Sequence, residues 1–338
     1  MTFPAMLRRV IAGEHLTAEE TAEAIGGIMD ESISPVQAAA LLAALAAKGE
    51  TVEEIVGAAR AMRERSLAVE CEFETVDVCG TGGDAAGTIN ISTAVAFVLA
   101  GAGLRVAKHG NRAASSKCGS ADVLEAMGVA IDAAPERASA LLERHGIAFL
   151  FAQRYHPAMR AVGPIRRELG VRTIFNMLGP ITNPARASRQ VIGVPQARWV
   201  HLLGEALREL GSEAGAIVHG TNGLDEIAGD VPSIVFQFDA SGARSWTLVP
   251  GDYGICATLA DLRGGDAAVN ADALMRILNG EQSPRADVIC LNAALAFVVA
   301  GRAESIDEGL EVARTSISSG TALRALDALR GRPEMEFA

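Results

Sequence analysis

Aromatic residues are scarce in this 338-residue chain, at 4% of the sequence, and basic residues are outnumbered. The chain has 30 Lys and Arg against 41 Asp and Glu, which gives a formal net charge of −11. Surfaces that bind nucleic acid or anionic membranes need a basic footprint, so we expect neither as a partner. Alanine, leucine, valine and glycine replace the aromatic residues, which is typical of helices packed closely on a sheet.

Paired cysteines and long apolar segments are also missing. The five cysteines, at positions 71, 79, 118, 256 and 290, show no paired spacing and indicate neither a disulfide framework nor a zinc site. They fit a reducing compartment, and we expect a cytoplasmic protein. The amino terminus lacks the apolar segment of a signal peptide. The apolar run that begins at Leu291 is far shorter than the ~20 residues of a membrane span, so we expect a core helix there.

Two patterns divide the chain. Residues 1–70 show helical periodicity and three capping boxes, at residues 17–20, 34–37 and 51–54. From residue 75, short β-type runs alternate with helices, and helices return from residue 270 to the end. This alternation predicts right-handed crossovers and a mostly parallel sheet. We expect strands at residues 75–80, 104–110, 147–152, 189–194, 214–220 and 233–238.

These patterns predict an α/β protein with two domains. The small domain is all-helical, over residues 1–70, and is joined by a helical insert at about 155–187 that lies between strands. The large domain, over residues 71–154 and 188–338, is α/β with a mostly parallel central sheet. Ligands of open α/β sheets bind beyond the carboxyl ends of the strands, so we expect the functional residues just after the strands.

A glycine-rich loop follows the first expected strand, with Gly80, Gly82, Gly83 and Gly87 inside eight residues. The loop matches the pattern G-x-G-x-x-A formally. Three interpretations are open: a tight turn that binds no ligand, a dinucleotide-binding loop, or a pocket for another phosphate. A fold that binds NAD needs an acidic residue after the next strand, to hold a ribose hydroxyl, but this chain has the basic segment 108–112 there. Those basic residues would be compatible with the 2′-phosphate of NADP. Asp84 would repel a pyrophosphate and suits a sugar hydroxyl or a metal-bound water.

Two further clusters suit an anion. Asn90, Ser92 and Thr93 lie at a probable helix start, where they either bind an anion or cap the helix. The segment at 108–120 combines basic side chains, hydroxyls and glycines, which favours a phosphate pocket over a solvated charged run. Its relevant residues are Lys108, Gly110, Arg112, Ser115, Ser116, Lys117, Gly119 and Ser120.

The last two clusters suggest a metal and a second substrate. Asp225 and Glu226 follow a strand and a turn, and they suit Mg²⁺ as well as an exposed acidic turn. The insert offers four basic side chains that could bind a carboxylate, although helix-surface arginines are common. They are His156, Arg160, Arg166 and Arg167. Together the clusters describe a sugar pyrophosphate with Mg²⁺ and chemistry by positioning and charge stabilisation.

With these residues the sequence resembles the anthranilate phosphoribosyltransferase family over nearly its whole length. The segments that carry the resemblance are GTGGD, NISTA, KHGNRAASSKCGSADVLEAMG, YHPAMR, RTIFNMLGPITNP and GLDEI, in the family's order and spacing. The resemblance implies a nucleoside phosphorylase/phosphoribosyltransferase-like fold and a homodimer formed through the helical domain. It also implies attack of the anthranilate amine on the anomeric carbon of 5-phosphoribosyl 1-pyrophosphate, with an oxocarbenium-like transition state. This reaction belongs to tryptophan biosynthesis.

The resemblance implies a role for each motif residue. The site of the phosphoribosyl donor comprises Gly80, Gly83, Asp84, Thr88, Asn90, Ile91, Ser92, Thr93, Lys108, His109, Gly110, Asn111, Arg112, Ala113, Ala114, Ser115, Ser116 and Ser120. Two Mg²⁺ ions are held by Ser92, Asp225 and Glu226. Anthranilate contacts Gly80, Asn111 and Arg166. His109 and Asn111 are candidates for orienting the acceptor, and no general base is assigned.

Three other functions fit parts of the sequence. A nucleoside phosphorylase of the same broad fold would need no magnesium, and the acidic pair at 225–226 argues against it. An oxidoreductase that uses NADP would need Arg112 for the 2′-phosphate. A non-catalytic relative that binds nucleic acid conflicts with the charge of −11.

Overall fold

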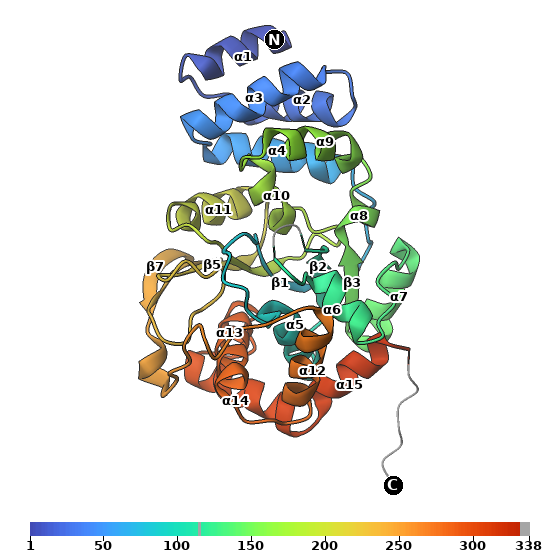
Figure 1. Cartoon of the computed structure of the whole chain (residues 1–338), viewed down its shortest axis with the longest axis vertical. Coiled ribbons are helices and arrows are strands. Elements are labelled where there is room, and N and C mark those ends of the chain that lie inside the picture. The colour runs from blue at the N-terminus through green and yellow to red at the C-terminus, as the bar shows by residue number, and fades with distance from the viewer. Residues whose placement is uncertain (114–115, 332–338) are drawn as a thin grey trace.

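The computed structural model describes residues 1–113 and 116–331, and Figure 1 shows a small helical part above a larger α/β part. The small part begins with four helices, α1 (Phe3–Ile11), α2 (Ala18–Met29), α3 (Pro35–Lys48) and α4 (Val52–Glu64). Complete capping boxes form at Thr17 and Thr51, as expected. The box at Ser34 is only half formed: the Ser34 hydroxyl accepts from the backbone of Gln37, but the Gln37 side-chain oxygen lies 3.3 Å from that same hydroxyl.

A seven-stranded sheet forms the centre of the large part, in the order β3-β2-β1-β4-β5-β6-β7. Its strands are β1 (Val76–Gly80), β2 (Val106–Gly110), β3 (Ile147–Phe151), β4 (Arg189–Gly193), β5 (Ala214–Gly220), β6 (Ser233–Asp239) and β7 (Gly242–Leu248). The first five pair in parallel, whereas β6 and β7 are antiparallel, which confirms the mostly parallel sheet. The sequence did not predict β7, because its residues are mostly exposed and lack an apolar alternation.

Helices cover both faces of the sheet. Alternating residues of β4 separate two cores: Val191 packs with α5 (Ile91–Gly101) and the C-terminal helices, and Ile192 packs with the N-terminal helices and α11 (Arg198–Glu209). The C-terminal helices are α12 (Ala267–Leu278), α13 (Pro284–Val299), α14 (Ile306–Ser318) and α15 (Thr321–Leu329). The apolar run at Leu291 lies in α13 and is buried, as expected.

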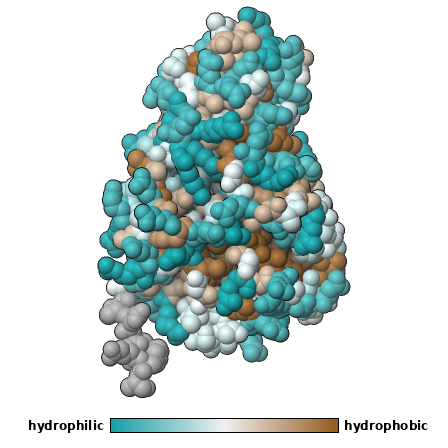
Figure 2. All heavy atoms as spheres, turned by 180° about the vertical axis from the view of Figure 1, so that it is seen from behind, coloured by the Kyte–Doolittle hydropathy of each residue, from teal (hydrophilic) through white to brown (hydrophobic). Residues whose placement is uncertain are grey.

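The surface shows how the apolar residues are distributed. Figure 2 shows a mostly hydrophilic face with hydrophobic patches over the larger part. No helix within residues 1–113 and 116–331 combines the length and the hydropathy that a membrane span requires.

The insert is helical and packs on the N-terminal helices. It contains α8 (Ala152–Tyr155), α9 (Met159–Leu169) and α10 (Phe175–Ile181), with α9 against α2 and α3 and α10 against α4. The half-buried Arg63 guanidinium donates to the carbonyl of Ile181 at 2.8 and 3.0 Å and to that of Leu210 at 3.3 Å. This one side chain therefore ties α4 to the insert and to the end of α11.

The segment after β2 is less regular than the sequence indicated. The helix expected from Ser120 is two helices, α6 (Ser120–Ala126) and α7 (Pro135–His145), separated by an irregular connection that contains Gly128 at a φ of +84°. Pro135 begins α7 because its fixed φ and missing N–H suit the first helical turn.

Candidate active site

The site lies where the strand order of the sheet reverses. β1 pairs with β2 on one side and with β4 on the other, so the crossovers leave β1 in opposite directions and open a crevice at the carboxyl ends. Gly80 ends β1 and Gly193 ends β4, and both lie against Asp225 in the loop after β5. A Cβ atom on Gly80 would overlap the Asp225 carboxylate, and one on Gly193 would overlap the Asp225 carbonyl. Both glycines therefore make room for the acidic loop.

Asp225 and Glu226 are brought together with the glycine loop and with α5. The Asp225 carboxylate accepts from the N–H of Gly82 at 2.7 Å, and the Glu226 carboxylate accepts from the N–H of Ser92 at 3.2 Å. Burial raises the pKa of both carboxyls, to about 7 for Glu226, and the nearby charge of Asp84 raises that of Asp225 further. Asp225 is buried at the crevice and Glu226 is half-buried beside it, so the exposed acidic turn considered from the sequence is wrong.

The acidic pair fits a magnesium ion. Burial raises the pKa of both carboxyls because it disfavours their charged form, and a bound cation would compensate that charge. Among the described residues, no three His, Cys, Asp or Glu side chains are arranged to hold a metal on their own. Mg²⁺ typically uses one or two carboxylates together with waters and substrate phosphates, so a pair is sufficient.

Lys108 and His109 lie within β2, in agreement with the strand expected at residues 104–110. Lys108 is buried, donates to the carbonyl of Val78 at 2.8 Å and lies 3.4 Å from the hydroxyl of Ser92. The buried Asp77 carboxylate accepts from Asn183 at 2.7 Å and from the N–H of His109 at 3.2 Å. The buried positive charge of Lys108 opposes the rise that burial causes in the pKa of both Asp77 and Glu226.

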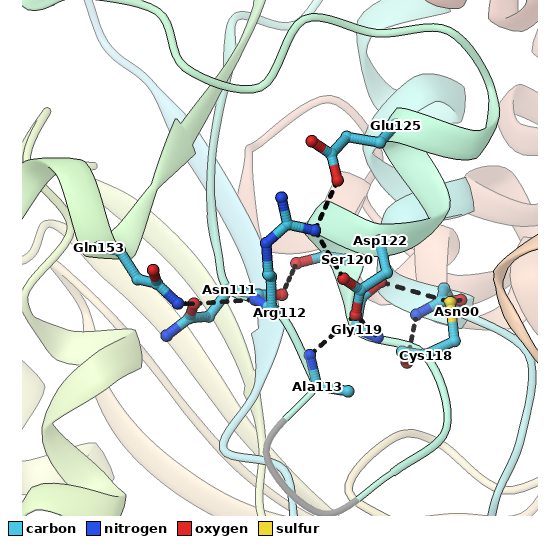
Figure 3. A network of polar contacts seen from close by, with 10 residues as sticks. All are labelled: Asn90, Asn111, Arg112, Ala113, Cys118, Gly119, Ser120, Asp122, Glu125 and Gln153. Atoms are coloured by element: carbon cyan, nitrogen blue, oxygen red, sulfur yellow. Dashed lines mark hydrogen bonds and ion pairs between the residues drawn. The ribbon is translucent and has the colours of Figure 1, made fainter. Parts of the chain in front are cut away.

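The loop after β2 is held by α6, as Figure 3 shows. Arg112 forms ion pairs with Asp122, at 2.9 Å, and with Glu125. Asp122 also accepts from the N–H groups of Ala113 and Gly119, both at 2.9 Å. A phosphate at Arg112 would have to compete with these carboxylates, which the sequence did not indicate. Ala114 and Ser115, both predicted donor-site residues, lie outside the described residues.

Hydrogen bonds hold both ends of the same loop. The Ser120 hydroxyl donates to the carbonyl of Asn111 at 3.2 Å, and a Cβ atom on Gly110 would overlap that hydroxyl. Ser116 is exposed, and its hydroxyl donates to the carbonyl of Cys118 at 3.4 Å. Asn111 is exposed at the end of β2.

The start of α5 is bonded to the acidic loop, since the N–H of Ser92 donates to the Glu226 carboxylate. Asn90 occupies the N-cap position without a side-chain cap, so the plain capping considered from the sequence is wrong. Its side chain donates to the carbonyl of Cys118 at 3.2 Å and accepts from Asn270 at 2.9 Å. The Thr93 hydroxyl is buried and has no hydrogen-bond partner in the described part of the chain. Ile91 is buried in the core, and Thr88 forms a backbone bridge with Arg263.

Buried polar atoms without partners also lie between the insert and the sheet. The rings of His109 and His156 are 5.1 Å apart, and burial lowers the pKa of His109 to about 3 and that of His156 to about 4. Among the buried atoms without a hydrogen-bond partner within residues 1–113 and 116–331 are five that belong to β2, to the glycine loop and to the insert. They are His109 Nε2, His156 Nδ1 and Nε2, Thr81 Oγ1 and Thr173 Oγ1. Neutral orphaned groups of this kind suit a polar organic ligand.

Arg166 lies on α9 of the insert. Its guanidinium carbon is 5.9 Å from the ring centre of Phe175, and partial burial lowers its pKa. Asn111 accepts from the N–H of Arg112 at 2.8 Å, and Gln153 Nε2 lies 3.4 Å from the same oxygen. In the described structure Arg166 and Asn111 do not hydrogen-bond to each other. The sequence pointed to His156 only through its motif, and nothing in it singled out Thr81 or Thr173.

Comparison with known proteins identifies the family of the chain. The family described as "Glycosyl transferase family, a/b domain" matches residues 72–323, and "Glycosyl transferase family, helical bundle domain" matches residues 4–66. The anthranilate phosphoribosyltransferase of Rubrobacter xylanophilus is 51% identical over 95% of this chain and 94% of its own length. That of Xanthobacter autotrophicus is 48% identical over 97% and 95%.

Solved structures agree with these relatives. The anthranilate phosphoribosyltransferase of Thermus thermophilus has a TM-score of 0.91 and 44% identity and covers 96% of this chain and 98% of its own. The enzyme of Saccharomyces cerevisiae in complex with PRPP and Mg has a TM-score of 0.89 and 27% identity, with 97% of each chain covered. With both domains matched and close to half of the residues shared with full-length relatives, the chain belongs to the anthranilate phosphoribosyltransferase family.

Proposed function

We propose that this chain transfers the 5-phosphoribosyl group of 5-phosphoribosyl 1-pyrophosphate to the amine of anthranilate. The products are N-(5-phosphoribosyl)anthranilate and pyrophosphate, in a step of tryptophan biosynthesis. The observation that carries the proposal is the pair of Asp225 and Glu226, whose carboxylates accept from the N–H of Gly82 in the glycine loop and from the N–H of Ser92 in the first turn of α5. Acidic residues at an anion-binding edge are consistent with a donor that arrives with magnesium.

The donor is expected to lie across the carboxyl ends of β1 and β2. The glycine loop, the start of α5 and the loop after β2 would hold it, through the residues that the family resemblance implies. Ser92 and Glu226 would hold one Mg²⁺ ion, and Asp225 and Glu226 a second. When bound, Mg²⁺ neutralises charge on the pyrophosphate that leaves. Lys108, fixed beneath Ser92, adds a positive charge that needs no rearrangement.

The acceptor is expected to lie between the insert and the end of β2. Arg166 would pair with the anthranilate carboxylate, and Gly80 and Asn111 would contact the same molecule. His109 Nδ1 lies 3.1 Å from the carbonyl of Gly179, so Nδ1 carries the proton and Nε2 presents a lone pair. With a pKa of about 3, His109 stays neutral and orients the amine by accepting its hydrogen bond rather than removing a proton.

The proposal also covers the domains, the oligomeric state and the location of the protein. Residues 1–70 and the insert at about 155–187 would form the helical domain, and residues 71–154 and 188–338 the α/β domain. The chain would form a homodimer through the helical domain. It would act in the cytoplasm, on small molecules rather than on nucleic acid or membranes.

The first test follows the fluorescence of anthranilate with the donor, with and without Mg²⁺. We expect a magnesium-dependent decay matched by pyrophosphate release. A chain that binds the donor in calorimetry but leaves the fluorescence unchanged would contradict anthranilate as the acceptor. Cleavage of nucleosides by phosphate without magnesium would instead identify a phosphorylase.

A further inference from the structure

Arg172 reaches from the insert to the glycine loop of the large part. It lies between α9 and α10, and its Nη2 donates to the carbonyl of Gly83 at 2.6 Å and lies 3.4 Å from the carbonyl of Gly82. The guanidinium carbon is 5.3 Å from the ring centre of Trp199, which is buried on α11. A Cβ atom on Gly83 would overlap the guanidinium, so this contact needs glycine.

The contact holds one residue of the glycine loop, and the acidic pair holds the residue before it. Gly82 donates its N–H to Asp225, whereas Gly83 offers its carbonyl to Arg172. The two glycines have φ values of +74° and +78°, a flexible backbone that outside contacts must hold in place. In a trans peptide the carbonyl and the next N–H point in opposite directions, so the N–H of Asp84 points away from Arg172. Arg172 thereby sets which backbone groups the loop presents to its ligand.

The side chain suits this task because of its shape. A guanidinium can donate to two neighbouring carbonyls and at the same time lay its flat face on an indole ring. A lysine ammonium is a point charge and cannot do both. The loop before α10 also follows Arg166 by only a few residues, so the insert that carries the proposed acceptor contact also carries the contact to the donor loop.

We propose that Arg172 is a positioning residue that holds the glycine loop in the conformation that receives the phosphoribosyl donor. The inference rests on the proposed function for the identity of the donor. It assigns Arg172 no contact with either substrate. Its loss should therefore weaken donor binding through the loop and leave acceptor binding nearly unchanged.

The test compares four proteins: wild type, Arg172→Ala, Arg172→Lys and Arg208→Ala. Arg208 is the matched control, since it is an arginine on α11 whose ion pair with Glu205 lies at the surface. For Arg172→Ala we expect a rise of about tenfold in donor KM and in the calorimetric donor Kd with Mg²⁺, and less than a twofold change in anthranilate KM. Arg172→Lys should restore little of the donor affinity, and Arg208→Ala should match wild type.

Hydrogen exchange reports on the loop itself. The amides of residues 80–87 should exchange faster in Arg172→Ala than in wild type, while those of β1 stay protected. An unchanged donor Kd with unchanged exchange overturns the inference. Full rescue by lysine also overturns it, because that result would indicate a direct charge contact with phosphate. A wild-type chain that binds the donor without turning over anthranilate refutes the proposed function alone, and one that binds no donor refutes both.

Discussion

At the scale of single residues, burial keeps the imidazole rings of His109 and His156 neutral. Both rings fold into the region between the insert and the sheet, and burial lowers their pKa to about 3 and about 4. A histidine in the unfolded chain has a pKa of about 6.5. Between these values the unfolded chain binds more protons than the folded one, so folding becomes less favourable as the pH falls.

This difference can be measured at His156. Replacing it in His156→Gln removes one titrating group, so wild type should lose stability relative to the variant as the pH falls from about 6.5 towards 4. The slope should be at most about 1.4 kcal/mol per pH unit, and it should vanish above pH 7. Urea unfolding of both proteins at pH 7.5, 6 and 5 checks it. Stability curves that stay parallel over this range would show that His156 is not buried as a neutral ring.

Asp225 and Glu226 give the second prediction at this scale. Asp225→Asn together with Glu226→Gln keeps the shape of both side chains and removes the charge that would hold magnesium. We expect kcat to fall about 100-fold or more and the magnesium titration to flatten. Glu205→Gln, which removes a carboxylate from a surface ion pair on α11, serves as the control and should behave as wild type. Wild-type activity of the double variant at every magnesium concentration would refute the metal assignment.

At the scale of elements, apolar patterns in the sequence predicted the buried strands but not the exposed strand. The buried run at Ala214–Gly220 gave β5 with its observed bounds, whereas β7 was missed because its residues face solvent. The positions of the motifs were also predictable, since the residues after β1, β2 and β5 meet at one edge of the sheet. The contacts between segments were not. Nothing local in the sequence shows that Arg112 pairs with α6 or that Arg172 reaches Gly83.

β4 lies very close to the loop that carries Asp225, so a larger side chain at Gly193 should lower the stability of the protein. In Gly193→Ala the new methyl group would overlap the carbonyl of Asp225, so either the strand or the acidic loop must shift. We expect a loss of about 1–3 kcal/mol of stability and a weaker response to magnesium. Gly163→Ala is the control, because its site in α9 has open space and alanine favours a helix by up to about 1 kcal/mol. Equal stability of the two variants, measured by urea unfolding, would contradict the close approach.

At the scale of the whole molecule, one core joins the two parts. The cluster that contains the N-terminal helices also contains residues of α11 and of one face of the sheet, such as Ile192 and Ile217. The helical part therefore has no separate core in the described structure, and residues of the insert belong to the same shared core. Movement of the insert relative to the sheet must then involve contacts such as that of His109 in β2 with the carbonyl of Gly179 in α10.

The outer surface of the helical part bears on the proposed homodimer. Ile11 on α1 is 68% exposed and Val36 on α3 is 80% exposed, and these helices pack against each other. If this surface forms the dimer, light scattering of the wild type should give about twice the chain mass of 35.1 kDa. Val36→Lys should lower the measured mass towards that of one chain, because it places a charge in an apolar contact. Val269→Lys, at a 53% exposed site on α12 of the large part, should leave the mass unchanged. A dimer that persists in Val36→Lys and dissociates in Val269→Lys would move the interface to the other end of the molecule.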